Sequence, residues 1–201
     1  MPRKARQHTI APNSLYHIVC RGNNQRRIFR SARDYSKLLK ILGEVKREFP
    51  FYLYSFIFLP NHYHLEVESQ DVSVSKIMQR INFLYVKYFH KRYNTSGHLF
   101  QDRFYSSLID KNSYFWEASR YIDLNAVRAG LVEKPEDYPW SSYSVYYKKD
   151  YNGKYGKLID WQRFLEYSGE NIEQSRLDYL KFVEDGLKLK KEPGFVNKQM
   201  I

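Results

Sequence analysis

The apolar residues follow two different periods along the chain. Short apolar runs and strict alternation are typical of strands, whereas apolar residues spaced about 3.6 apart are typical of amphipathic helices. These patterns predict strands at residues 15–20, 51–59, 62–67 and 104–109, and helices at residues 34–49, 73–93 and 113–129. The order is that of a ferredoxin-like split β-α-β fold of the α+β class, an antiparallel sheet with helices on one face. The last helix is an addition at the C-terminal end of that fold.

Turn signals support these boundaries. Gly22 and its neighbours end the first strand, Pro50 ends the first helix, and Pro60 separates two strands that we interpret as a hairpin. Beyond Pro135 the sequence becomes irregular and rich in Tyr, and we expect a further helical segment at about residues 159–189.

Length and cysteine content exclude several classes of protein. The 201 residues fit one domain, or one domain with an appended subdomain. The single cysteine, Cys20, excludes a disulfide scaffold and a cysteine-based zinc finger, and it agrees with a reducing cytosol. The longest apolar run, residues 51–60, is shorter than the roughly 20 residues of a membrane span. Because the first residues also lack the apolar stretch of a signal peptide, we expect a cytoplasmic protein with no membrane partner.

The positive charge is confined to the first half of the chain. Residues 1–100 hold 17 basic and 6 acidic side chains, whereas residues 101–201 hold 16 of each, so the net charge of +11 comes entirely from the first half. Together with 35 aromatic residues, 19 of them Tyr, this composition favours an unpaired or hairpin nucleic acid, on whose bases aromatic rings stack. An anionic membrane surface and simple solubility are the alternatives. The candidate nucleic-acid contacts before the first acidic residue are Arg3, Lys4, Arg6, Arg21, Arg26, Arg27 and Arg30.

Two residue pairs carry candidate chemistry. His62 and His64 leave the same face of their strand, so their imidazoles can converge on one metal ion, although such a pair is also common as a packing feature. Tyr121 and Asn125, four positions apart, share one face of the predicted last helix, and a buried Tyr with a hydrogen-bonded Asn is the alternative there. If this helix packs beside the histidines, Asn125 supplies a third ligand and Tyr121 stands next to the metal.

Such a site suits phosphodiester chemistry. A cation held by two imidazoles and an amide oxygen keeps positions open for phosphate oxygens and offsets the charge of the pentacoordinate state. The Tyr121 phenol would attack, and the resulting aryl phosphate would remain reactive enough to be rejoined.

Four ordered motifs now make the sequence recognisable. They resemble the single-tyrosine HUH transposases, and most of all the REP-associated tyrosine transposases, over residues 10–147. The motifs are PNHYH at residues 60–64, GHLFQDRF at 97–104, RYIDLNAVRAG at 120–130 and YPWSSY at 138–143. One departure is Ala126, which stands where the family usually has proline.

The resemblance implies roles residue by residue. His62 and His64 correspond to metal ligands for Mg²⁺ or Mn²⁺, and Asn125 to the polar ligand after the nucleophile. Tyr121 corresponds to the nucleophile that forms a 5′-phosphotyrosine link with single-stranded DNA. We accordingly expect a catalytic domain at residues 1–147 and a C-terminal helical extension with a flexible tail at residues 148–201.

The sequence therefore predicts a metal-dependent endonuclease and strand transferase that acts on single-stranded DNA beside hairpins, as a monomer or homodimer. Further candidate phosphate contacts are Arg103, Arg120 and Arg128, which ordinary surface exposure would equally explain. A domesticated hairpin-DNA binder with little or no catalysis is the main alternative. A ferredoxin-like RNA-binding module is a more distant one, because it would present aromatics where this sheet presents histidines.

Overall fold

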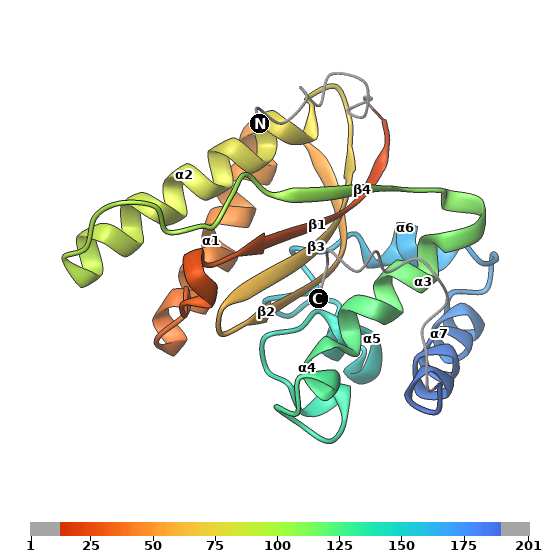
Figure 1. Cartoon of the computed structure of the whole chain (residues 1–201). Coiled ribbons are helices and arrows are strands. Elements are labelled where there is room, and N and C mark those ends of the chain that lie inside the picture. Colours follow the sequence, from red (N-terminus) through yellow and green to blue (C-terminus); the bar gives the residue numbers. More distant parts are fainter. Residues whose placement is uncertain (1–12, 190–201) are drawn as a thin grey trace.

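The computed structural model describes residues 13–189, apart from the side chains of residues 111–113. Its centre is a four-stranded antiparallel sheet with the strand order β2-β3-β1-β4 (Figure 1). The strands are β1 (Leu15–Arg21), β2 (Phe51–Leu59), β3 (His62–Ser69) and β4 (Tyr105–Ile109). This confirms the four predicted strands, the hairpin and the ferredoxin-like arrangement.

Two long helices cover one face of the sheet (Figure 1). They are α1 (Ala32–Glu48) and α2 (Val74–Tyr93). On β3 the residues that face them are Tyr63, Leu65 and Val67, all fully buried, and the Tyr63 hydroxyl donates to Asn82 of α2 at 2.5 Å. Because strand side chains alternate, His62, His64 and Glu66 project from the opposite face.

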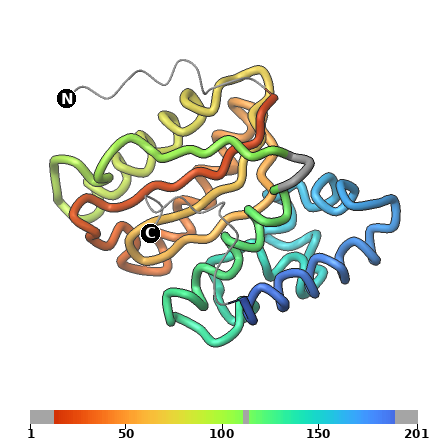
Figure 2. The backbone as a smooth tube through the Cα atoms, turned by 45° about the vertical axis from the view of Figure 1, so that its right-hand side comes forward, coloured from red at the N-terminus to blue at the C-terminus, as the bar shows by residue number. Residues whose placement is uncertain are grey.

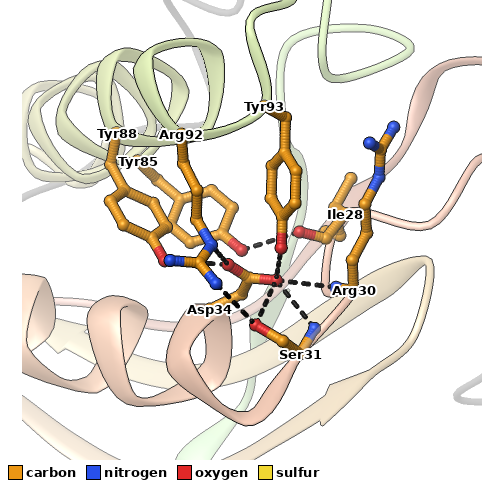
Figure 3. A network of polar contacts seen from close by, with 8 residues as sticks. All are labelled: Ile28, Arg30, Ser31, Asp34, Tyr85, Tyr88, Arg92 and Tyr93. Carbon is orange, nitrogen blue, oxygen red and sulfur yellow. Dashed lines mark hydrogen bonds and ion pairs between the residues drawn. The ribbon is translucent and has the colours of Figure 1, made fainter.

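A buried carboxylate connects the start of α1 to the end of α2 (Figure 3). Asp34 closes a capping box with Ser31, and it accepts hydrogen bonds from the Tyr88 hydroxyl at 2.8 Å and the Tyr93 hydroxyl at 2.7 Å. Arg92 adds an ion pair at 3.4 Å. Burial works to raise the pKa of Asp34, but the hydrogen bonds outweigh it and lower this pKa. The network therefore stabilises the contact between the start of α1 and the end of α2.

The opposite face is covered by the chain after β4. Helix α3 (Lys111–Asp123) crosses this face, and a short helix α4 (Asn125–Arg128) follows it (Figure 1). The prediction of one continuous helix at 113–129 is therefore wrong at Leu124, where the helix is interrupted. The Asn125 Nδ2 atom donates to the Tyr121 carbonyl at 2.8 Å, so a side chain competes for an acceptor that the backbone ladder would use.

The C-terminal part contains more helix than the sequence pattern predicted. A 3₁₀ turn and helix α5 lie in the region expected to be irregular, and the expected segment at 159–189 is divided into two helices. These elements are η3 (Pro135–Asp137), α5 (Tyr143–Lys148), α6 (Trp161–Glu166) and α7 (Ile172–Leu187). Phe164 of α6 and Tyr179 of α7 belong to the same buried cluster as Leu15 of the sheet. In Figure 2, α7 runs beside α3 on the far side from the sheet.

Within residues 13–189, no helix combines the length and the apolar character that crossing a membrane would need.

Candidate active site

The two candidate ligand histidines lie at the start of β3. His62 is paired with Arg21 of β1, and His64 is paired with Val19, so both imidazoles emerge beside the C-terminal end of β1. Their ring centres are 5.0 Å apart. The His62 Nδ1–H donates to the Asn61 side-chain oxygen at 2.7 Å, which leaves the Nε2 lone pair of His62 for another partner.

Burial keeps these histidines neutral. It lowers the pKa of His62 to about 4, with a smaller contribution from the positive charge of Arg21. It also lowers the pKa of His64 well below its ordinary value, with help from His17, His62 and Arg21. A neutral imidazole is the form that binds a metal ion. The chemistry of the pair therefore suits ligation at neutral pH.

The structure brings Tyr121 to this pair. Tyr121 lies on α3 and is 6% exposed, and its ring meets the ring of His64 edge to face at 5.9 Å between centres. The Arg128 guanidinium, from helix α4, lies 5.2 Å from the centre of the Tyr121 ring. The sequence left open whether the last helix packs beside the histidine strand, and in the structure it does, because α3 crosses the face from which His64 projects.

Asn125 lies one helical turn beyond Tyr121, at the start of α4. Its Nδ2 atom is engaged with the Tyr121 carbonyl, so the amide oxygen is the atom it offers to other groups. Among residues 13–189, His, Cys, Asp and Glu side chains form no group of three that would hold a metal ion. The Asn125 amide is the further ligand that the sequence offers beside the two histidines.

One observation is compatible with a cation at this site. The Nε2 atom of His64 is fully buried and has no hydrogen-bond partner among the described residues. A buried imidazole nitrogen in that state is disfavoured, and either a metal ion or a water molecule at this position would satisfy it.

Two buried carboxylates, which the sequence patterns did not identify, dock α3 on the sheet. Glu66 accepts a short hydrogen bond from Ser119, and Asp123 accepts hydrogen bonds from Ser55 at 3.2 Å and Tyr179 at 2.5 Å. Burial raises the pKa of Asp123 to about 7, and it raises the pKa of Glu66 well above its ordinary value. Alternation along β3 puts Glu66 on the face of His64, but only the position of α3 shows that both acids are buried.

A third histidine was also missed. His17 of β1 is fully buried, and its Nε2 atom lies 2.9 Å from Nδ1 of His64. Its ring also meets the ring of Tyr121 at 5.6 Å. His17 and His64 are 47 residues apart in the chain, so only the strand pairing reveals the contact.

The candidate phosphate contacts fall into different environments. Arg26 donates to the His98 carbonyl at 2.8 Å, Arg30 lies 4.7 Å from the centre of the Tyr93 ring, and Arg27 is exposed. Arg103 is exposed as well, and it lines a cavity of about 990 Å³ between α2 and the loop before β4. Arg3, Lys4 and Arg6 lie outside the described residues.

Arg120 corrects one expectation. It is 4% exposed, its guanidinium pairs with Glu117 at 2.6 Å, and it lies 3.9 Å from the centre of the Phe182 ring of α7. Arg120 is therefore part of the interface between α3 and α7, and its side chain is not placed to contact a phosphate. Arg128, in contrast, lies beside Tyr121.

Comparisons with known proteins bear on the family and on the fold of this chain. The family model described as "Transposase IS200 like" matches residues 11–125, which is more than half of the chain. A solved structure of a REP-associated tyrosine transposase bound to a REP hairpin matches with a TM-score of 0.63 and 20% sequence identity. The match covers 75% of this chain and 87% of that chain, and at this identity it shows a shared fold. No curated protein matches the sequence.

Proposed function

Because the chain belongs to the family of IS200-like transposases, we propose that it cuts and rejoins single-stranded DNA through Tyr121 at sites marked by a hairpin. The observation that supports the proposal is the contact of the Tyr121 ring with the ring of His64, because it joins the candidate nucleophile to a candidate metal ligand.

In the proposed reaction the Tyr121 oxygen attacks the phosphorus of a phosphodiester. A bond forms between the phenol oxygen and phosphorus, and the bond from phosphorus to the 3′ oxygen breaks. The phenol proton leaves as the bond forms, and the departing 3′ oxygen takes up a proton to become a hydroxyl. The products are a 5′-phosphotyrosine and a free 3′-hydroxyl, which can reverse the reaction.

His62, His64 and Asn125 would hold a divalent cation, Mg²⁺ or Mn²⁺, which would supply charge stabilisation to the phosphate. Asn61 orients His62, because the Asn61 oxygen accepts the Nδ1 proton. The Arg128 guanidinium also donates to the Tyr121 carbonyl at 3.3 Å, which restrains the nucleophile at the end of α3. These contacts would limit the motion of the reacting groups.

The DNA surface of the proposal lies beside this site. Backbone hydrogen bonds join Gly22 to Asn61 at 2.8 Å and Gln101 to Arg21 at 2.9 Å. The basic turn at residues 21–27 and the loop before β4 therefore flank the histidines. Arg27 and Arg103 on these loops are exposed. We propose that they, with Arg21 and Arg26, bind the phosphates of a DNA hairpin; the structural neighbour is itself bound to a REP hairpin.

The test is a covalent-adduct assay with a hairpin-bearing single strand and Mn²⁺. Tyr121→Phe is expected to abolish the adduct and to leave hairpin binding within about twofold, because only the attacking oxygen is removed. The control is Tyr147→Phe, since Tyr147 is 47% exposed and is not among the contacts of the site. An adduct that persists in Tyr121→Phe refutes the role of Tyr121. Hairpin binding by the wild-type protein without any adduct would favour a binding protein instead.

A further inference from the structure

The contact between His17 and His64 has an unusually well-defined geometry. The two rings are inclined by only 12°, and their centres are 5.1 Å apart. Each imidazole nitrogen lies about 1.1 Å from its ring centre, as bond lengths near 1.33 Å require in a five-membered ring. Two such radii and the 2.9 Å contact together span the separation of the centres. The two nitrogens therefore lie on the line that joins the ring centres, and the rings meet edge to edge rather than as a stack.

This geometry identifies the contact as a linear hydrogen bond. The lone pair or N–H of an imidazole nitrogen points outward from the ring centre, so His17 Nε2 and His64 Nδ1 point directly at each other. A cation bound by both atoms would have to sit away from both lone-pair directions. His17 is therefore a hydrogen-bond partner of His64, and its Nε2 atom does not share a metal ion with the Nδ1 atom of His64.

The position of the proton decides what His64 can do. If His17 donates, His64 carries its own proton on Nε2, the fully buried atom that has no partner among residues 13–189. If His64 donates from Nδ1, Nε2 carries a lone pair. His62 shows the second pattern, since Asn61 accepts its Nδ1 proton. Ligand histidines commonly donate their second N–H to such an outer partner, which fixes the tautomer and the ring orientation.

We propose that His17 is a positioning residue of the metal site: its Nε2 accepts the Nδ1 proton of His64 and holds His64 in the tautomer that presents Nε2 to the cation. The inference rests on the proposed function, because it takes His64 as a ligand. His17 does for His64 what Asn61 does for His62. Since its ring also contacts Tyr121, His17 sets the relative position of ligand and nucleophile.

The first experiment measures the tautomer without metal or DNA. Long-range ¹H–¹⁵N correlation spectra of the metal-free protein, with His64 assigned by substitution, are expected to show its proton on Nδ1. In His17→Phe, which keeps an apolar ring but removes the acceptor, the signal is expected to shift toward the Nε2-protonated form. A wild-type His64 that carries its proton on Nε2 overturns the inference.

The second experiment measures Mn²⁺ affinity by the electron paramagnetic resonance signal of the free ion. His17→Phe is expected to weaken binding by about 10–100-fold, the usual effect of removing an outer-shell partner. His17→Gln is expected to restore affinity to within a few-fold, because its amide oxygen can accept the same proton. Leu15→Val, on the same face of β1, controls for disturbance of the strand and should bind like the wild type. Equal Mn²⁺ affinity in His17→Phe and wild type overturns the inference.

The two experiments separate this inference from the proposed function. A wild-type protein that binds no Mn²⁺ would contradict the metal role. The tautomer spectrum would then test only whether His17 accepts the Nδ1 proton of His64. A normal adduct in the wild type together with an unaltered His17→Phe would leave the proposed function in place and remove the inference.

Discussion

Replacing Asp123 by Asn should change how the stability of the protein depends on pH. Asp123 is fully buried between α3, the sheet and α7, and burial raises its pKa from the usual 3.8 to about 7. The folded protein therefore binds a proton at this group over a pH range in which the unfolded chain has lost it. Such a group destabilises the fold as the pH rises from about 4 to about 7.

The size of the effect follows from the pKa change. At about 1.4 kcal/mol per pH unit, the rise from 3.8 to about 7 corresponds to roughly 4 kcal/mol of destabilisation when Asp123 is fully ionised. Between pH 5 and pH 8 the part that develops is roughly 2–3 kcal/mol. Asparagine resembles the protonated acid, and the hydroxyls of Ser55 and Tyr179 can turn to accept its N–H. The stability of Asp123→Asn relative to wild type should therefore increase by roughly 2–3 kcal/mol between these pH values.

The assay is urea unfolding followed by circular dichroism at pH 5 and pH 8. Asp178→Asn is the matched control, because Asp178 directly precedes Tyr179 on α7 but its side chain is exposed. The control should keep the pH dependence of the wild type. If the stability difference between Asp123→Asn and wild type were the same at both pH values, the assignment of Asp123 as a buried acid that resists ionisation would be refuted.

Three other predictions test the fold and the DNA surface. Asp34→Asn should lower the free energy of unfolding by about 2–4 kcal/mol at pH 7, because an amide N–H would face hydroxyl and backbone donors; denaturant unfolding measures this, and a loss below about 0.5 kcal/mol would contradict it. Arg120→Met should destabilise the protein in the same assay and leave hairpin affinity unchanged, since its guanidinium is buried against α7; a large loss of affinity at unchanged stability would restore it as a DNA contact. Arg103→Ala should leave stability unchanged and reduce the slope of log affinity against log salt by about 0.7–0.9, the contribution of one phosphate contact, and an unchanged slope would remove Arg103 from the DNA surface.

Much of the fold was predictable because its signals are local. The periodicity of apolar residues indicates strand or helix within a single segment, and the order of the segments then leaves few compact arrangements. The interruption at Leu124 was not predictable in this way, because it accompanies a side-chain hydrogen bond that competes with the backbone. The same limit applies to α5, whose six residues are too few to show a helical period.

For the candidate site, too, the features set by one local element were predictable and the features set by packing were not. Alternation within β3 was sufficient to put His62 and His64 on one face. Helical spacing related Tyr121 to Asn125, although the structure divides the expected helix between them at Leu124. These inferences use the geometry of one element at a time.

The sequence by itself therefore determined the element order, the histidine pair and the residue types of the candidate chemistry. Only the tertiary structure decided that His17 joins His64, that Asp123 and Glu66 are buried beneath α3, and that Arg120 is occupied while Arg103 is exposed. The physical reason is that strand register and helix docking depend on how the whole core packs. A one-residue change of register would turn His17 to the other face of the sheet, and nothing in its immediate sequence would reveal the difference.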